Sequence, residues 1–424
     1  MMTDPVALLL RRAGFGPTAT ELSAARRAGY AATLSALLTP TGPDVGASSA
    51  PLPDLPLDPY AGQRDPSPEQ KIAFERRRER ETDEITRWWV DRMTVASHQA
   101  IEKLVFFWHG HWATSVKKVR SPQLMMVQHR TFREAPDFAA LARRMVIDPA
   151  LVLYLDGHRN TAQAPNENLA RELFELFVLG IGQYTEKDVK EAGRALTGWR
   201  YSLAEERAVF DPLAHDSGRK TILGTTQYFD AISLIELLLR QEACPRFIAA
   251  RLWFRYASSS RPIPTSLQDR MVEAFPVPTA MLRTMFEDDA FQATDGELVK
   301  QPIEWFVGAM RQLGIRPAAL PDDTQREWLK LLEDLGQLPF APPNVGGWRA
   351  GPAWLTSAAA QTRLRLAGKL AEQVTIDRLT PESLAYLLCV DGWSNRTYAV
   401  LRDASADPRR LLTLGLVSPE YLVT

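Results

Sequence analysis

The chain has 424 residues, with 50 lysines and arginines against 51 aspartates and glutamates, and its formal net charge is −1. This length is enough for one or two domains with a large core. The balanced charge excludes a basic footprint for nucleic acid or an anionic membrane, so we expect neither partner. Cys244 and Cys389 match no metal or redox motif, and we expect both to be reduced and packed as apolar residues.

The N-terminus has only five consecutive apolar residues, Val6 to Leu10, and Asp4 precedes them. A signal peptide has a longer apolar region that follows basic residues. No stretch approaches the roughly 18 apolar residues that span a bilayer. We therefore expect a cytoplasmic protein with no membrane partner.

Three regions follow one another along the chain. Residues 1–39 are predicted to form short N-terminal helices, in which Thr18 and Glu21 make a capping-box pair. Residues 40–68 contain eight prolines and are predicted to be an irregular excursion. Residues 69–424 are assigned to one main helical domain that carries the site, and it opens with a long helix whose charges indicate a solvated face.

Helical spacing continues through most of this main domain. The exception is Trp199–Phe210, where aromatic and β-branched residues on either side of a charged turn predict a small β-hairpin. The following HDSGRKTILG is predicted to be a polar loop. The fold class is therefore all-α, a single large multi-helical domain with at most a small β-hairpin near 199–210.

The stretch PNENLARELFELFVLG is predicted to form one helix, with Asn166 as its N-cap and Gly180 as its stop. Its apolar face carries Leu169, Leu173, Leu176 and Phe177. A second, polar face carries Asn168, Arg171, Glu172 and Glu175. This polar face is either a solvated row of salt bridges or a buried stripe that binds a metal or substrate.

Histidines supply the other candidate ligands. His109 and His111 lie in FFWHGHWATS, an apolar segment in which a break at Gly110 would let both rings turn toward one ion. His215 and Asp216 precede Ser217-Gly218-Arg219-Lys220, which is a candidate anion-binding turn. The alternatives are core or capping histidines for the first pair and an ordinary solvated loop for the second.

Several catalytic motifs are absent from the sequence. It contains no G-x-S-x-G, no G-x-G-x-x-G and no P-loop. His158 is a weaker site candidate, and His98 and His129 have no acidic neighbours and are interpreted as structural. The segment Asn344–Arg349 is predicted to be a tight turn that Trp348 anchors in the core.

Five stretches together resemble a known family: LLRRAGFGPT, FFWHGHWATS, PNENLARELFELFVLG with YTEKDVKEAGRALTGW, HDSGRKTILG, and PFAPPNVGGWRAGPAWLTSAAAQTR. They resemble the bacterial family labelled domain of unknown function 1800, and they span nearly the whole chain. The resemblance implies a mostly helical fold and no particular activity. The chain departs from the family's typical forms at Gly110, Trp112, Leu169, Phe177 and Ser217; histidine is frequent at the position of Phe177.

The polar residues of these blocks predict a metal-dependent enzyme with a mixed histidine–carboxylate site. We assign four ligands, His109, His111, Glu172 and His215, to iron, manganese or zinc. Catalytic roles fall to Glu175 and Asp216, and substrate-binding roles to Asn168, Arg171, Arg219 and Lys220. With ligand bonds of about 2.0–2.2 Å, the ligand atoms are expected to lie within about 4–5 Å of each other.

The favoured function is a non-haem metal oxidoreductase that acts on a small molecule or peptide with an anionic group. A metal-assisted hydrolase, with Glu175 or Asp216 as the base, is the second candidate. The third is a non-enzymatic binding or scaffold protein with a buried polar network, in which residues 40–68 contact a protein partner.

Overall fold

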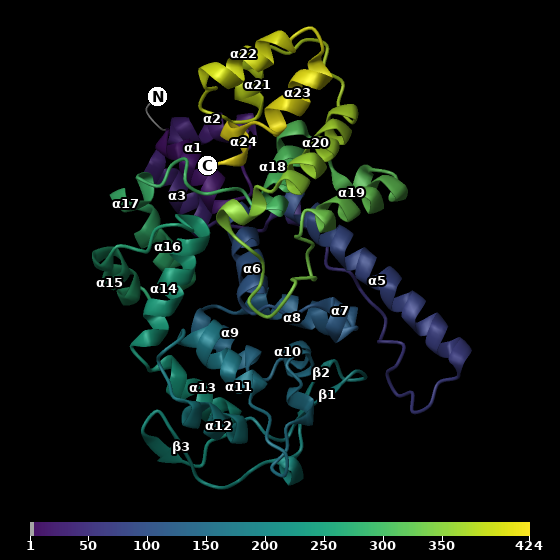
Figure 1. Cartoon of the computed structure of the whole chain (residues 1–424), viewed down its shortest axis with the longest axis vertical. Helices are drawn as coiled ribbons and strands as arrows, with labels where there is room; N and C mark the ends of the chain where they lie inside the picture. Colours follow the sequence, from purple (N-terminus) through teal and green to yellow (C-terminus); the bar gives the residue numbers. More distant parts are fainter. Residues whose placement is uncertain (1–3) are drawn as a thin grey trace.

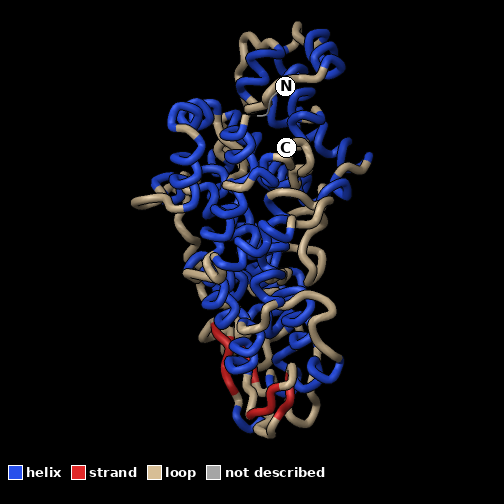
Figure 2. The backbone as a smooth tube through the Cα atoms, turned by 90° about the vertical axis from the view of Figure 1, so that its left-hand side faces the viewer, coloured by secondary structure: helices blue, strands red, loops and turns tan. Residues whose placement is uncertain are grey.

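Helices make up nearly all the regular structure of residues 4–424, the part of the chain that the computed structural model describes (Figure 1). The body is elongated. Its strands lie at one end, and the C-terminal helices lie at the other (Figure 2). The predicted all-α fold class is confirmed.

The first part of the chain supplies the N-terminal helices and the centre of the body: α1 Pro5–Ala13, α2 Ala19–Ala28, α3 Tyr30–Leu38, α4 Val45–Ser48, α5 Pro68–Val95, α6 Gln99–His111, α7 Val116–Val119, α8 Pro122–Glu134, α9 Phe138–Met145 and α10 Pro149–Tyr154. The middle part forms the end that carries the strands: the 3-10 turn η1 Gly157–Arg159, α11 Asn168–Glu172, the π-helix η2 Leu173–Val178, α12 Glu186–Ala195, β1 Trp199–Ser202, β2 Arg207–Phe210, η3 Pro212–Ala214, β3 Lys220–Ile222, β4 Thr225–Gln227 and α13 Ala231–Leu239.

The last part returns along the body: α14 Ala243–Tyr256, α15 Thr265–Glu273, α16 Pro278–Phe286, α17 Asp289–Gln292, α18 Pro302–Leu313, η4 Pro317–Ala319, α19 Asp322–Asp334, η5 Gly351–Trp354, α20 Ser357–Glu372, α21 Pro381–Leu387, α22 Asn395–Asp403, α23 Pro408–Leu416 and α24 Pro419–Leu422. One large apolar core joins residues from all three parts. No helix within residues 4–424 is both long enough and apolar enough to cross a membrane. Both cysteines are buried and free.

Polar contacts along the proline-rich excursion tie it to the body, and two of them involve its aspartates. Asp44 accepts hydrogen bonds from the backbone N–H groups of Ser97 (2.8 Å) and His98 (2.9 Å), and so fixes the turn between α5 and α6. Asp58 is buried and pairs with Arg78 of α5 (2.6 Å). The segment therefore packs along α5, which leaves the body on one side (Figure 1).

Two small hairpins are present. The predicted one pairs β1 with β2, from Trp199 opposite Phe210 to Ser202 opposite Arg207. The second pairs β3 with β4; β3 and the turn lie in the segment 215–224 that was predicted to be a loop, and β4 follows that segment. Its two-residue turn, Leu223-Gly224, has positive φ at both positions (48° and 76°). Such turns usually carry Asn-Gly or Asp-Gly, so leucine gave no hairpin signal.

The stretch predicted to be a single α-helix ends at Gly180 as expected, with φ +86° there, but only its first turns are α-helical. From Leu173 to Val178 it widens into a π-helix, and the N–H groups of Leu179 and Gly180 both donate to the carbonyl of Phe174. A wider turn shifts the residues that follow around the helix axis, and π-turns occur frequently at functional sites.

One buried carboxyl in this fold makes a pH-dependent prediction. Asp148 caps α10 and accepts hydrogen bonds from the Leu151 N–H and the Gln128 amide, both at 2.8 Å. Burial raises the pKa of this carboxyl from 3.8 to about 7, although these hydrogen bonds oppose the shift. The folded state therefore binds the Asp148 proton more tightly than the unfolded state does. The protonated carboxyl makes its full contribution to folding stability below about pH 4, and this contribution is lost as the pH rises through about 7.

Asp148→Asn keeps a good N-cap and removes the titrating group. We expect the variant to match the wild type near pH 4 and to be more stable at pH 8, by up to about 4 kcal/mol. Urea denaturation midpoints measured between those two pH values test this. Parallel pH profiles for the two proteins would contradict it.

Candidate functional site

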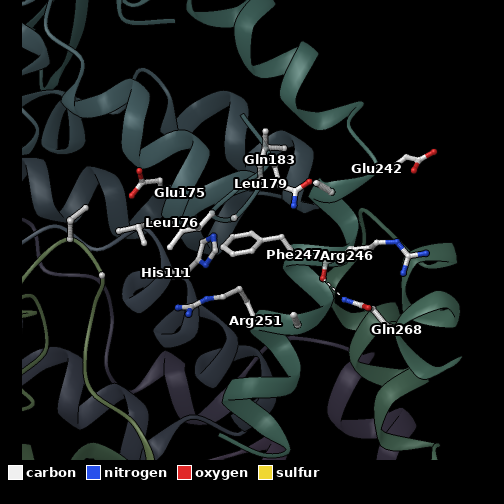
Figure 3. A pocket seen from close by; sticks show the side chains of 16 residues that line it. His111, Glu175, Leu176, Leu179, Gln183, Glu242, Arg246, Phe247, Arg251 and Gln268 are labelled. Carbon is white, nitrogen blue, oxygen red and sulfur yellow. Dashed lines mark hydrogen bonds between the residues drawn. The ribbon is translucent and has the colours of Figure 1, made fainter. Parts of the chain in front are cut away.

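A cavity of about 640 Å³, which we call the main cavity, opens beside the π-helix. Its volume lies within the range typical of small-molecule sites. Residues of α6, the π-helix, α14 and α15 wall it, together with the loop that follows the π-helix and the loop at Val345–Gly346 (Figure 3). Those that matter for its chemistry are His111, Glu175, Leu176, Leu179, Phe247 and Arg251.

His111 is buried at the end of α6, and its Nε2 lies 2.8 Å from the carbonyl oxygen of Phe177. Because a carbonyl only accepts, Nε2 carries the proton, and Nδ1 of the neutral ring keeps a lone pair. Burial and then the charge of Arg251 lower the pKa of His111 from 6.5 to about 3, against the effect of the Phe177 hydrogen bond. Nδ1 is buried and has no hydrogen-bond partner within residues 4–424.

Arg251 lies on α14 beside His111, on the lower side of the cavity in Figure 3. Its Nε is buried without a partner, and in the described part of the chain its guanidinium makes neither a hydrogen bond nor an ion pair. The Cζ of this group lies 5.8 Å from the centre of the Phe254 ring. An unpaired guanidinium in a partly buried wall is an unsatisfied site for an anion.

Glu175, by contrast, is already engaged. It lies 3.7 Å from the guanidinium of Arg171 and is hydrogen-bonded to Tyr184. Arg171 also makes two 2.9 Å hydrogen bonds to Glu186 and a third, of 3.2 Å, to Glu167. This half of the predicted polar face is thus a row of ion pairs along the cavity rim, and Arg171 is held by carboxylates of the chain itself.

Glu172 takes no part in these ion pairs. It is half-buried, and burial followed by the charge of Glu175 raises the pKa of its carboxyl. It makes no ion pair with any residue of the described chain and does not line the main cavity. Asn168 is exposed at the start of α11, where its N–H donates to the side chain of Asn166 (2.8 Å).

His109 does not share the cavity with His111. Gly110 does not break the chain: α6 continues through it to His111, and residues two apart on a helix face different sides. His109 is buried between Trp89 and Phe340, and its Nε2 accepts the backbone N–H of Phe340 at 3.0 Å. Burial lowers the pKa of His109 to about 3. The expectation that both rings turn toward one ion is therefore corrected.

His215 and Asp216 lie in the loop after η3, near α12. The Nδ1 of His215 is 3.0 Å from the carbonyl oxygen of Thr197 and 3.2 Å from its hydroxyl. Asp216 forms a two-point ion pair with Arg194 (2.7 and 3.2 Å), which lowers the pKa of the aspartate. Neither residue lines the main cavity.

The adjoining basic residues divide into one buried and one exposed. Lys220 is buried and donates to three backbone carbonyls, those of Asp216, Gly218 and Phe229, so it stabilises the loop. Arg219 is exposed. Of the two cations of the predicted anion-binding turn, Lys220 therefore has a structural role, because its three hydrogen bonds to backbone carbonyls leave it unable to bind an anion. Only Arg219 could bind one.

Within residues 4–424, no group of three or more His, Cys, Asp or Glu side chains is arranged to hold a metal ion. The predicted convergence of His109, His111, Glu172 and His215 is therefore not found. Of all the predicted site residues, the structure brings only His111 and Glu175 to the main cavity.

Sequence reasoning missed Arg251, the most unusual charge at this site. A signal was present: Arg251 and Arg255 are four residues apart on the otherwise apolar face of CPRFIAARLWFRY, with no carboxylate in helical register to pair with either. Buried arginines without a local partner mark ligand sites or tertiary ion pairs. Arg255 makes a tertiary ion pair with Glu304 (3.0 Å), whereas Arg251 has no such partner and marks a candidate ligand site.

The fold and cavity define a class: an all-α protein with a helix-lined cavity in which a neutral histidine lies beside an unpaired arginine. The family model described as protein of unknown function (DUF1800) matches residues 8–423, so the chain belongs to that family. The family resemblance of the sequence is thereby confirmed. No curated protein and no solved structure matches the chain.

Proposed function

We propose that this protein is an enzyme that binds a small molecule or peptide with an anionic group in the main cavity and uses His111 to accept a proton. The observation that carries the proposal is that His111 and Arg251 lie side by side in the cavity wall, and neither group is satisfied by the described chain. One presents an unpartnered lone pair, the other an unpartnered positive charge, and both line the same cavity.

The charges around the cavity favour an anionic ligand. Glu175 is matched by Arg171, and Arg246 at the outer rim is matched by Asp269 (2.8 Å). Glu242 is exposed at the rim, where water screens its charge (Figure 3). Arg251 is left with no counter-charge in the described chain, and a bound carboxylate or phosphate would supply one.

Anion binding would also change the chemistry of His111. Part of the lowering of the His111 pKa comes from the charge of Arg251. An anion on that guanidinium offsets this charge, so the pKa of the ring rises and the ring becomes a better base. The basicity of His111 is therefore coupled to the presence of ligand.

A metal-dependent reaction is the second candidate, and one observation favours it. Histidine ligands of metals usually donate their other ring N–H to a carbonyl or carboxylate, as His111 does to Phe177. In this candidate the Nδ1 of His111 is a metal ligand, and Glu175 is a carboxylate that lines the same cavity. The oxidoreductase and hydrolase functions both belong to this candidate.

The first test is calorimetric binding of N-benzoylglycine, which carries an aromatic body and a carboxylate. The wild type should bind it and take up protons near pH 5, whereas the uncharged amide of the same compound should not bind. His111→Gln keeps an N–H for Phe177 and lacks the Nδ1 lone pair, so this variant should bind without proton uptake. His215→Gln, which removes a distant imidazole, should behave as the wild type.

Two results would reject the proposal: equal binding of acid and amide, or unchanged proton uptake in His111→Gln. Elemental analysis of protein purified without chelator separates the metal candidate. One equivalent of iron, manganese or zinc that is lost in His111→Gln supports it. A metal-free protein whose melting temperature is unchanged by added metal contradicts it.

A further inference from the structure

A second, smaller cavity of about 40 Å³ adjoins the main cavity. The two share His111, Arg251 and Gly346 as lining residues. The small cavity is further walled by Arg255 of α14 and by Trp348, which lies in the loop between α19 and η5. Because the two cavities share these lining residues, we treat them as adjoining parts of one site and call the small cavity its inner end.

Four residues that line the small cavity each carry a buried polar atom without a hydrogen-bond partner in the described chain. Three are donors: Arg251 Nε, Arg255 Nη2 and Trp348 Nε1. The fourth is the acceptor, His111 Nδ1. Each buried polar atom without a partner destabilises the protein, so a ligand that satisfies all four atoms would remove this cost.

The charge around the inner end is also incomplete. Arg255 pairs with Glu304 at 3.0 Å, but Lys103 lies 2.6 Å from the same carboxylate oxygen. Two buried cations thus share one carboxylate. Arg251 adds a third positive charge with no partner within the described residues. An anion in the small cavity would supply the missing counter-charge.

The wall that carries Trp348 is held firmly. Its ring stacks on Phe106, with the centres 5.1 Å apart and the planes 13° from parallel. Gly347 has φ +81°, and a Cβ there would lie 2.3 Å from the carbonyl oxygen of Gly110, so only glycine lets the loop approach α6 this closely. The indole N–H is therefore presented by a preorganised loop.

We propose that the small cavity binds the carboxylate of the ligand through Arg251, Arg255 and Trp348, and that the ligand carries an O–H or N–H on the adjacent carbon that donates to His111. The proposal rests on the proposed function, and it names the ligand class: a 2-hydroxy acid, a 2-amino acid derivative or a peptide C-terminus. A water molecule needs roughly 10–15 Å³, so the cavity holds about three atoms, the size of a carboxylate.

The test uses small probes that need only the inner end. Glycolate and propionate have the same number of non-hydrogen atoms, but only glycolate has the O–H donor. By NMR titration at constant ionic strength, glycolate should bind about three- to tenfold more tightly than propionate. Phosphate, whose tetrahedral anionic group is bulkier than a planar carboxylate, should bind more weakly than both.

The matched variants are Trp348→Phe and Trp354→Phe. Trp354 also has a buried, unpartnered Nε1 but lines neither cavity. Trp348→Phe keeps an aromatic ring on Phe106 but removes the indole N–H, so the affinity for glycolate should fall roughly 10- to 100-fold. Trp354→Phe should leave this affinity unchanged. If Trp348→Phe does not fold, Arg255→Lys takes its place with the same expected loss, because lysine can keep the ion pair with Glu304 but lacks the unpartnered Nη2 donor.

Equal binding in Trp348→Phe and wild type, or phosphate binding ahead of glycolate, would overturn the carboxylate subsite. The two proposals can fail separately. If Trp348→Phe weakens glycolate binding but N-benzoylglycine binds the wild type no more tightly than glycolate does, the carboxylate subsite is supported and the main-cavity function is rejected. If N-benzoylglycine binds tightly and is unaffected by Trp348→Phe, the main cavity stands and the subsite falls.

Discussion

Replacing Glu304 with glutamine is expected to destabilise the protein by about 3–5 kcal/mol, the cost of leaving buried charges without their partner. Glu304 of α18 is buried between Lys103 (2.6 Å) and Arg255 (3.0 Å), and its other oxygen accepts the N–H of Gln301 (2.8 Å). Glutamine keeps the last contact but turns an amide toward two cations. Urea denaturation should show a clear fall in the midpoint.

The pH dependence of this effect follows from its cause. Burial would raise the pKa of Glu304, but Arg255 and Lys103 outweigh it and lower the pKa from 4.5 to about 2. A lowered carboxyl pKa stabilises the fold above about pH 4.5, and the contribution is lost as the pH falls toward 2. The difference between wild type and Glu304→Gln should therefore shrink in acid.

A surface pair provides the control. Glu236 and Arg143 form an ion pair in which both side chains are substantially exposed. Glu236→Gln should therefore cost less than about 1 kcal/mol. If Glu304→Gln were no more destabilising than Glu236→Gln, the buried network would not hold α6, α14 and α18 together as the structure indicates.

Arg251→Met is expected to move stability and binding in opposite directions. It removes an unpaired charge whose burial lowers the pKa of the guanidinium, so the melting temperature should rise, by an amount equivalent to about 1–2 kcal/mol. It also removes the group that pairs with the anion, so N-benzoylglycine should bind roughly 100-fold more weakly or not at all. Such opposed effects are typical of residues kept for function.

Arg246→Met is the matched control, because Arg246 also lines the main cavity but is exposed and already paired with Asp269. It should change both stability and binding only slightly. A lower melting temperature for Arg251→Met, with binding intact, would show that Arg251 supports the fold and not a ligand.

Most of the fold could be predicted from the sequence because helical spacing of apolar residues is a local signal. The hairpin at 199–210 could also be predicted, because aromatic and β-branched residues on either side of a charged turn are likewise a local signal. The hairpin from Lys220 to Gln227 was not, because its Leu-Gly turn lacks the residues that usually mark a two-residue hairpin turn. The π-helix was also hidden: its Phe177 carbonyl is bound by His111, 66 positions away.

The site was only partly predictable. The composition of the histidine and glutamate blocks located His111 and Glu175, but nothing local shows which way a side chain faces once α6 runs through Gly110. His215 resembles a ligand in sequence and instead contacts Thr197. Arg251 is recognisable as a candidate site residue only from the tertiary structure, in which it lies beside His111 without a charged partner.

The most direct test of the main-cavity proposal is a crystal structure of the protein with N-(4-bromobenzoyl)glycine, in which anomalous scattering locates the bromine. We predict the carboxylate about 2.7–2.9 Å from the guanidinium of Arg251 and the bromophenyl ring in the main cavity near Phe247. A ligand bound elsewhere on the protein, with Arg251 and His111 still unoccupied, would contradict the proposal.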